Sequence, residues 1–270
     1  MTVEPGAGPR WPARSVSTEA AEAAYRVRFD EAGPDGVARP STLLRYAQDV
    51  AWIHSESLGF DRAWYATRGL AWVVRSAQLA TLAPVRTGNL VVARTQVVGF
   101  RKIWARRRTE VRSLDGDAPS ELLAWLHTDW VMTDERGAPA RVPPEIPAVF
   151  GMPPGPYTPL RVELPDPPDR AVHHRLTVRP RDIDPMGHAN NAVYLDWAAE
   201  AAALVLEDAG PAVVTRARLE YLTPAAPGDA LVAAAWELPG DGNDPHAGRE
   251  IAVRIRRADG ADILRAAIGG

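Results

Sequence analysis

The 270-residue sequence contains no cysteine and a single lysine, Lys102. The lack of cysteine excludes disulfide bonds, thiolate metal sites and a cysteine nucleophile. The formal net charge is only −3, so bulk electrostatics favour neither a nucleic acid nor an anionic membrane surface as a partner. No apolar run in the sequence is as long as a membrane span. We therefore expect no nucleic-acid partner and no membrane partner.

The sequence also lacks the motifs of several common enzyme classes. It has no Gly-x-Ser-x-Gly elbow, no Gly-x-Gly-x-x-Gly turn and no P-loop. Histidines are few, and the segment containing Asp182, Asp184 and His188 offers no second histidine as a ligand. We therefore expect neither a metal ion nor a cofactor, and no serine-hydrolase mechanism.

Proline and glycine divide the chain into segments. Residues 1–22 are rich in Pro, Gly, Ser and Ala without a signal-type apolar run, so we expect a disordered leader and a cytoplasmic protein. Prolines are densest between Glu135 and Val172, a composition typical of an extended linker laid over the surface. The predicted organisation is a leader (1–22), an N-terminal domain (23–146), a linker (147–172) and a C-terminal domain (173–270).

The two halves resemble each other at a fixed offset of 151 residues. Without a gap, eight positions coincide: Val27/Val178, Arg28/Arg179, Pro34/Pro185, Gly36/Gly187, Ala38/Ala189, Leu44/Leu195, Ala47/Ala198 and Ala51/Ala202. Chance in an Ala-rich chain is the competing explanation. The coincidences keep the same structural order in both halves, which favours a true tandem repeat.

Each half predicts a short strand, a Gly/Pro-bearing loop, a long helix and then several strands. The expected helices are 41–58 and 191–208, and the apolar residues of each share one face. The expected strands are 25–29, 71–82, 90–100, 103–114, 121–133, 174–178, 213–222, 230–238, 249–257 and 262–268. The predicted fold is therefore α+β, a double hot dog whose two repeats each have a long central helix wrapped by an antiparallel sheet.

Reactive side chains occur in only one of the two equivalent loops. Asp184, His188 and Asn190 stand where the first half has Gly33, Val37 and Arg39, while the Pro, Gly and Ala frame is shared. One copy is thus predicted to carry chemistry and the other to supply scaffold and substrate wall. The competing interpretations are a turn-forming Asp182 and Asp184, and a structural His188.

The position of this loop, between a strand and a helix, suggests how its groups act. Asn190 is a good N-cap for the helix that begins near Asn191, and free N–H groups there attract negative charge. A thioester carbonyl placed on them would be polarised. Asp184 is then a candidate general base or nucleophile, and His188 a residue that positions water, orients the carbonyl or shares the base role. We include Gly187 and Asn191 as substrate-binding residues.

From about Tyr25 to Gly270 the sequence resembles the acyl-ACP thioesterases of plants and bacteria, which are double hot dogs. The motifs that carry the resemblance include Leu43-Leu-Arg-Tyr-Ala-Gln-Asp-Val-Ala51, Leu70-Ala-Trp-Val-Val-Arg75, Arg179-Pro-Arg-Asp-Ile-Asp184, His188-Ala-Asn-Asn191 and Leu219-Glu-Tyr221. The resemblance implies hydrolysis of acyl thioesters, with the family's Asp and His at Asp184 and His188.

The chain departs from the plant enzymes at two places. Met186 replaces an asparagine, and Pro224-Ala225 replace a Glu-Cys pair. The pattern Asp-Pro-Met-Gly-His-Ala-Asn-Asn is also similar to single-hot-dog acyl-CoA thioesterases, in which an aspartate and a helix N-terminus do most of the work. Asp184 is therefore the leading catalytic residue.

Other residues are candidates for binding the acyl chain and its carrier. Gln48, on the first predicted helix, is expected to approach the reacting centre from the other half, and tryptophans such as Trp72 are expected to line an acyl channel or pack in the core. Arg101, Lys102, Arg106 and Arg108 form the densest basic patch, suited to an acyl carrier protein or the phosphates of coenzyme A, or simply an exposed strand. We expect a monomer or a homodimer of double hot dogs.

Two alternative functions remain open on this fold. One is a non-catalytic acyl-binding protein. The other is a hot-dog hydratase or dehydratase. Those enzymes resemble an Asp-x-Asn-Pro-x-His pattern, in which the His follows the Asp by five positions, whereas His188 follows Asp182 by six. Release of a free thiol from an acyl thioester would distinguish hydrolysis from both.

Overall fold

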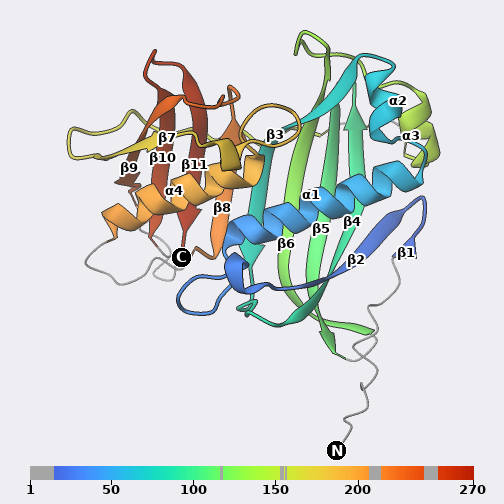
Figure 1. Cartoon of the computed structure of the whole chain (residues 1–270), viewed down its shortest axis with the longest axis horizontal. Coiled ribbons are helices and arrows are strands. Elements are labelled where there is room, and N and C mark those ends of the chain that lie inside the picture. The colour runs from blue at the N-terminus through green and yellow to red at the C-terminus, as the bar shows by residue number, and fades with distance from the viewer. Residues whose placement is uncertain (1–14, 116–117, 153–154, 156, 207–213, 240–248) are drawn as a thin grey trace, which may run out of the picture.

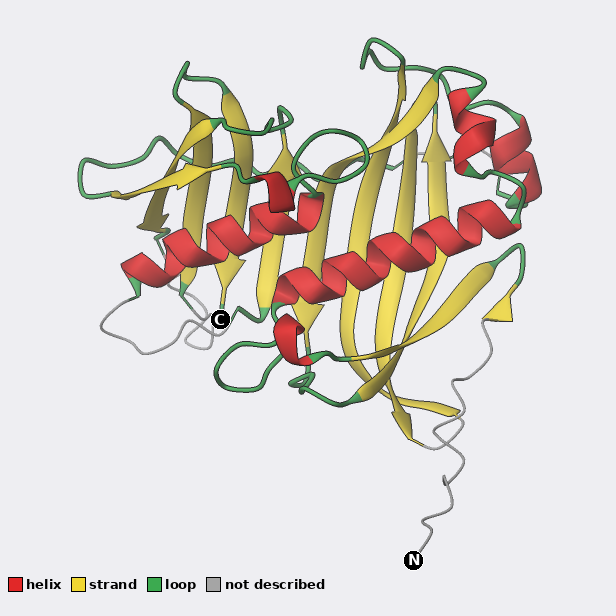
Figure 2. Ribbon diagram, in the orientation of Figure 1, coloured by secondary structure: helices red, strands yellow, loops and turns green. Residues whose placement is uncertain are grey.

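A single antiparallel sheet forms one layer of the molecule, and two long helices lie across one of its faces (Figures 1 and 2). The computed structural model describes residues 15–115, 118–152, 155, 157–206, 214–239 and 249–270. Its strands are β1 (Ser15–Val16), β2 (Ala20–Arg26), β3 (Leu70–Thr81), β4 (Leu90–Arg101), β5 (Trp104–Asp115), β6 (Ala118–Asp134), β7 (Val172–Thr177), β8 (Arg216–Tyr221), β9 (Ala230–Glu237), β10 (Glu250–Arg257) and β11 (Asp262–Gly269).

The strand order of the sheet is symmetric about its middle. It reads β1-β2-β4-β5-β6-β3-β8-β11-β10-β9-β7, so β2 to β6 are mirrored by β7 to β11 in corresponding order. The two halves join where β3 pairs with β8, with Ser76 opposite Glu220 and Ala80 opposite Arg216. Because this pairing is continuous with the rest of the sheet, the two repeats share one sheet. The predicted double hot dog is confirmed.

The two central helices begin near the junction of the repeats and run apart from it (Figure 1). They are α1 (Pro40–Ser57) and α4 (Asn191–Val205). Proline at the first position of α1 needs no N–H partner, and Gly59, with φ of 88°, follows the helix end where a left-handed residue terminates a helix well. Apolar faces of both helices are buried in one core with the sheet. The last predicted residues of the second helix, 207–208, lie outside the described residues.

The loops that precede the two helices form matching hydrogen bonds, which confirms the repeat. The N–H of Gly33 donates to the carbonyl of Val37 at 2.9 Å, and that of Asp184 donates to the carbonyl of His188 at 3.0 Å. Gly36 and Gly187 both adopt positive φ, 73° and 84°. The two loops therefore share a backbone conformation although only one has reactive side chains.

The predicted leader (1–22) extends too far, because its last residues belong to the sheet. Residues 1–14 lie outside the described residues, but Ser15–Val16 and Ala20–Glu22 form β1 and the start of β2. Ala21 is fully buried, and β2 pairs with β4 from Ala20 to Arg26. Small alanines pack closely under α1, so a composition that suggested disorder instead forms part of the sheet.

The proline-rich region lies across the sheet after a short helix, α3 (Glu145–Val149). The N–H of Leu160 donates to Asp129 Oδ2 at 2.8 Å, and the N–H of Val162 donates to Glu220 Oε2 at 3.0 Å. Both carboxylates are almost fully buried, so they anchor this extended segment. The domain boundaries at 146 and 172 stay a prediction. No helix in the described part of the chain is both long and apolar enough to cross a bilayer.

Candidate active site

The loop between Asp184 and Asn190 is a tight turn that fixes the Asp184 carboxylate. Oδ1 of Asp184 accepts the N–H of Met186 at 2.8 Å, and its carbonyl accepts the N–H of Gly187 at 2.9 Å. Gly187 has φ of 84°, a conformation that a side chain would strain. Gly187 does not border the cavity described below, so the structure places it as part of the turn, and its substrate-binding role stays a prediction.

Asn190 caps α4, as predicted. Its Oδ1 accepts the N–H of Ala192 at 3.0 Å. Its Nδ2 lies 3.2 Å from Gln48 Oε1 and 3.4 Å from Asp184 Oδ2. One carboxamide therefore connects the helix start, the Asp184 carboxylate and a side chain of the first repeat.

One backbone donor remains at the start of α4. The cap occupies the N–H of Ala192, and the N–H of Val193 donates to the carbonyl of Asn190 at 2.9 Å. Among the described residues, no hydrogen-bond acceptor is found for the N–H of Asn191, the first residue of the helix. This N–H carries the positive end of the helix dipole and is free to bind an oxygen of a ligand.

A segment of the second repeat supports the loop from behind. The N–H of Ala189 donates to the carbonyl of Ala225 at 2.9 Å, and the N–H of Ala225 donates to the hydroxyl of Tyr194 at 2.8 Å. Burial raises the pKa of Tyr194 to about 12, so the hydroxyl is neutral at physiological pH. Ala225 therefore connects the loop to the side chain of Tyr194 on α4.

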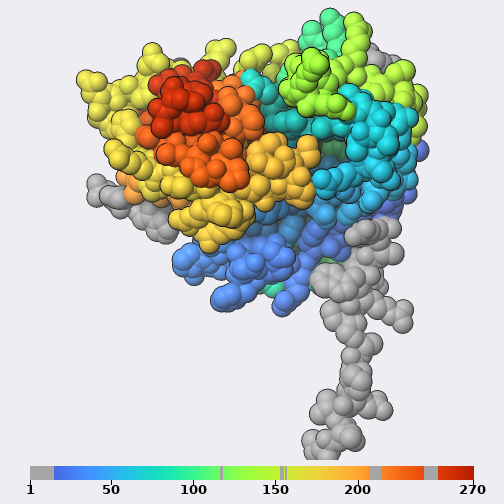
Figure 3. Space-filling view, turned by 45° about the horizontal axis from the view of Figure 1, so that its top comes forward, coloured from blue at the N-terminus to red at the C-terminus, as the bar shows by residue number. Residues whose placement is uncertain are grey.

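A cavity of about 680 Å³ begins at this loop and extends along α1 into the first repeat. Residues of both repeats line the cavity. They come from the loop between Asp184 and Asn190, one face of α1, the short helix α2 (Arg62–Ala66), strands β3 to β6, and α3. The repeats meet on the face seen in Figure 3, where yellow and orange residues of the second half lie against blue and cyan residues of the first. Asp184, His188, Asn190, Asn191, Gln48 and Trp72 all border this cavity.

The cavity wall is mainly apolar, as an acyl chain requires. Trp52, Trp72 and Trp130 line it, whereas Trp104 and Trp125 do not appear among its described lining residues. Trp52 and Met186 are each about half exposed, 52% and 50%, so they border the opening. The opening therefore lies between α1 and the loop that holds Asp184.

Part of the wall is polar and was not predicted. Arg107 is buried on β5, and its Nη1 lies 3.1 Å from His54 Nδ1, while His54 Nε2 donates to the carbonyl of Ser17 at 3.0 Å. Burial, followed by the Arg107 charge, lowers the pKa of His54 to about 4. Burial also lowers the pKa of Arg107 to about 10, so at neutral pH a guanidinium cation donates to a neutral imidazole.

The signal for Arg107 was present in the strand pattern. Arg106, Arg107 and Arg108 are consecutive, and alternate residues of a strand point to opposite faces. The middle arginine therefore faces α1 and the cavity, while its neighbours face outward. The sequence predicted a basic patch that includes Arg106 and Arg108, and it predicted no role in the cavity for Arg107.

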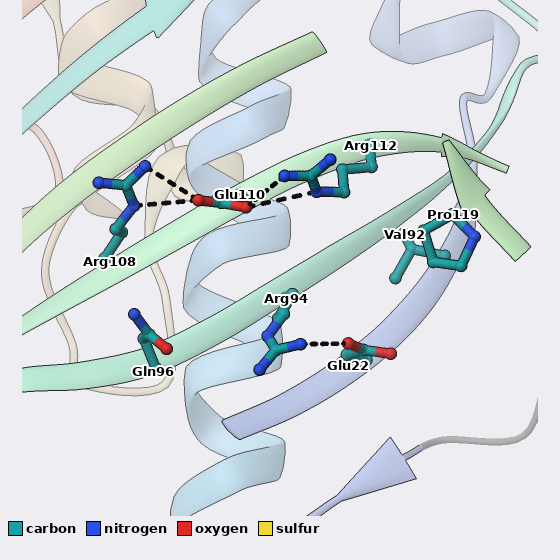
Figure 4. Close-up of a pocket in the computed structure, with 8 residues that line it drawn as sticks. All are labelled: Glu22, Val92, Arg94, Gln96, Arg108, Glu110, Arg112 and Pro119. Atoms are coloured by element: carbon teal, nitrogen blue, oxygen red, sulfur yellow. Dashed lines mark hydrogen bonds and ion pairs between the residues drawn. The ribbon is translucent and has the colours of Figure 1, made fainter. Parts of the chain in front are cut away.

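The structure does not bring the predicted carrier-binding residues together with Asp184. On the outer face of the sheet, Arg106 pairs with Asp129 at 2.7 Å, and Arg108 pairs with Glu110 at 2.9 Å. Figure 4 shows Glu110 held between Arg108 and Arg112, with α1 behind the strands. Arg101 donates to the carbonyl of Tyr157, and Lys102 lies in the turn between β4 and β5. Their carrier role stays a prediction, whereas the exposed Arg62 lies beside the loop, with Nη2 3.4 Å from the carbonyl of Pro185.

No cluster of three or more His, Cys, Asp or Glu side chains suited to a metal ion occurs within the described residues. The polar groups that border the cavity beside the loop are the Asp184 carboxylate, the His188 imidazole, the N-terminus of α4 and three carboxamides, those of Gln48, Asn190 and Asn191. These groups together suit attack of water on a polarised carbonyl.

Comparisons with known proteins identify the family of the chain. Residues 19–150 match the acyl-ACP thioesterase N-terminal domain, and residues 166–267 match the acyl-ACP thioesterase C-terminal domain. No curated protein matches the sequence significantly.

Three solved structures share the fold over nearly the whole chain. A candidate oleoyl thioesterase from Lactobacillus plantarum is 22% identical with a TM-score of 0.80, covering 92% of this chain and 94% of its own. An acyl-ACP thioesterase from Bacteroides thetaiotaomicron is 17% identical (TM-score 0.76; 93% and 97% covered). The 12:0-ACP thioesterase from Umbellularia californica is 21% identical (TM-score 0.75; 93% of each chain covered). The chain belongs to the acyl-ACP thioesterase family and is a hydrolase of fatty acyl thioesters.

Proposed function

We propose that the protein cleaves acyl-ACP, with Asp184 as the general base and the start of α4 as the site of the thioester carbonyl. One observation carries the proposal. Asp184 borders the same cavity as Asn191, whose backbone N–H has no acceptor in the part of the chain that the structure describes, and the cavity wall is otherwise mainly apolar. A carboxylate at this position can accept a proton from water while the helix N-terminus stabilises negative charge on the carbonyl oxygen.

In this proposal the reaction has two steps, addition of water and loss of the thiol. Asp184 takes a proton from water as the water oxygen bonds to the carbonyl carbon, and the π electrons of the carbonyl move to its oxygen. The N–H of Asn191 donates a hydrogen bond to the resulting oxyanion. When the oxyanion collapses, the carbon–sulfur bond breaks, and the thiolate takes the proton from Asp184 to leave as the carrier thiol. The acyl group leaves as a fatty acid.

Asn190 and His188 have supporting roles in this proposal. The cap bond to Ala192 fixes the carboxamide of Asn190, so its Nδ2 faces the Asp184 carboxylate at 3.4 Å and restricts its rotation. His188 borders the cavity close to Asp184 in the chain, where its ring can orient the attacking water. His188→Ala should then reduce kcat less than loss of Asp184.

The acyl chain lies in the cavity along α1 in this proposal. Its carrier arm enters between Trp52 and Met186, the two half-exposed residues at the opening. Because each buried methylene contributes about 0.8 kcal/mol, the length of this cavity selects the chain. The family match favours the acyl carrier protein over coenzyme A as the carrier.

The direct test is thiol release from a panel of acyl-ACP and acyl-CoA substrates. We expect the wild type to release free thiol at least as efficiently from acyl-ACP as from acyl-CoA of the same chain. Tight acyl binding with no thiol release would favour the alternative of a non-catalytic acyl-binding protein.

A further inference from the structure

Gln48 lies on α1, in the repeat that has no reactive loop, yet it borders the cavity beside Asp184. The equivalent position in the second repeat is Ala199, 151 residues later, so this carboxamide occurs once. Its Oε1 is 3.2 Å from Asn190 Nδ2. The chemistry that Gln48 offers to a substrate depends on which end of its amide faces the cavity.

The helix cap determines the orientation of both amides. Asn190 must present Oδ1 to the N–H of Ala192, because only an oxygen accepts a hydrogen bond there. Its other end is therefore the NH₂ group, which can only donate. The atom of Gln48 opposite it must in turn be the acceptor Oε1, which leaves the Nε2 hydrogens of Gln48 to other partners.

Among the described residues, no hydrogen-bond acceptor is found for Gln48 Nε2. Gln48 is partly buried and borders the cavity near Asp184, Asn190 and Asn191. A polar group in such a wall normally finds a partner, and a bound ligand can supply it. The group available is a donor, which suits a carbonyl oxygen and not a cation.

The proposed hydrolysis leaves a place for such a donor. One backbone donor, the N–H of Asn191, is available at the start of α4, and oxyanion sites commonly use a second donor from a side chain or the backbone. We infer that Gln48 is a catalytic residue that donates from Nε2 to the thioester carbonyl oxygen and holds the oxyanion together with Asn191.

This inference rests on the proposed function and gives the first repeat a role in the chemistry. The second repeat supplies the base and one donor, and the first repeat supplies the second donor. The cap of α4 determines that Asn190 donates, and Gln48 accepts, in the hydrogen bond between the two repeats. A second repeat alone would lack the Gln48 donor.

The kinetic test compares Gln48→Met, which removes the donor, with Gln78→Met, the same change at a partly buried glutamine of β3 that is not among the described lining residues of the cavity. With decanoyl-ACP, Gln48→Met should lower kcat by about 10² to 10³ and leave KM within a few-fold, as for loss of an oxyanion donor. Gln78→Met should keep kcat within about twofold. A raised KM with unchanged kcat, or no change in either, would overturn the inference.

A spectroscopic test does not depend on turnover. Decanoyl-CoA labelled with ¹³C at the carbonyl is bound to Asp184→Asn, and the infrared carbonyl band is compared with that in water. We expect a shift to lower wavenumber that is clearly smaller in Asp184→Asn/Gln48→Met. An identical shift in both proteins would contradict a bond from Gln48.

The two tests separate this inference from the proposed function. If wild type and Gln78→Met release thiol while Gln48→Met is equally active, the inference fails and the hydrolysis stands. If the wild type releases no thiol from any acyl-ACP or acyl-CoA, the proposed function fails, and the infrared shift alone then decides whether Gln48 contacts the carbonyl.

Discussion

Arg45 and Asp196 occupy equivalent positions in the two repeats, 151 residues apart, and their side chains form an ion pair. Nη2 of Arg45 lies 2.9 Å from Asp196 Oδ2, where α1 and α4 approach each other. In a dimer of two identical chains, the same residue would face itself at this point, and like charges would repel. The fused chain can place opposite charges there, so this contact is specific to the double hot dog.

Charge reversal tests the contribution of this pair. Arg45→Asp and Asp196→Arg should each lower the free energy of unfolding, because each places like charges together. The double variant should recover most of the loss. Since Arg45 is 40% exposed, we expect a coupling free energy below about 1 kcal/mol. Urea unfolding of the four proteins measures it, and strictly additive losses would mean that the pair contributes nothing.

His54 should make the stability of the protein depend on acidity. Its folded pKa is lowered to about 4, so between about pH 6.5 and pH 4 the unfolded chain binds a proton that the folded protein does not. Stability therefore falls as the pH falls through this window, by up to about 3 kcal/mol at about 1.4 kcal/mol per unit. Urea unfolding at several pH values should show this slope reduced in His54→Gln. Equal slopes in both proteins would show that His54 is not the cause.

Carrier recognition should depend on the cavity opening more than on the outer face of the sheet. Arg62→Ala should raise KM for acyl-ACP about three- to tenfold, with a weaker salt dependence and an unchanged kcat. Arg108→Ala is the matched comparison, because Arg108 is paired with Glu110 on the outer face. The opposite result, a raised KM only in Arg108→Ala, would support the basic patch that the sequence suggested.

The width of the cavity should control chain length. Ala105 lines the cavity from β5 and is buried, so Ala105→Phe fills part of the acyl site. Long acyl-ACPs should then lose kcat/KM more than short ones, by about fourfold per displaced methylene. A chain-length panel checks this, with Tm confirming that the variant folds. A uniform loss at all lengths would place the acyl chain elsewhere.

Local features of the sequence predicted the reactive loop well. The comparison of the halves separated Asp184, His188 and Asn190 from a shared backbone, and Asn190 was recognisable as a cap from its place before an apolar helix. Both features depend on neighbours in the chain, and the structure shows the same loop conformation in both repeats.

Features that depend on distant packing were harder to predict. β2 is made mostly of alanines and becomes a strand because β4 and α1 cover it. The short helices α2 and α3 line the cavity together with strands that are distant from them in the chain. The carrier role of the basic patch stays a prediction, because charge alone does not indicate which face of a strand a residue occupies. The contact of Gln48 with Asn190 joins residues 142 apart in the chain. The sequence predicted only that Gln48 approaches the reacting centre from the other half.

Asp184→Asn tests most directly whether Asp184 is the base for thioester hydrolysis. The asparagine Oδ1 can still accept the N–H of Met186, so the loop is expected to keep its shape. Thiol release from decanoyl-ACP under single-turnover conditions should fall by about 10² to 10⁴, with acyl binding and Tm little changed. Thiol release at the wild-type rate in Asp184→Asn would contradict the account.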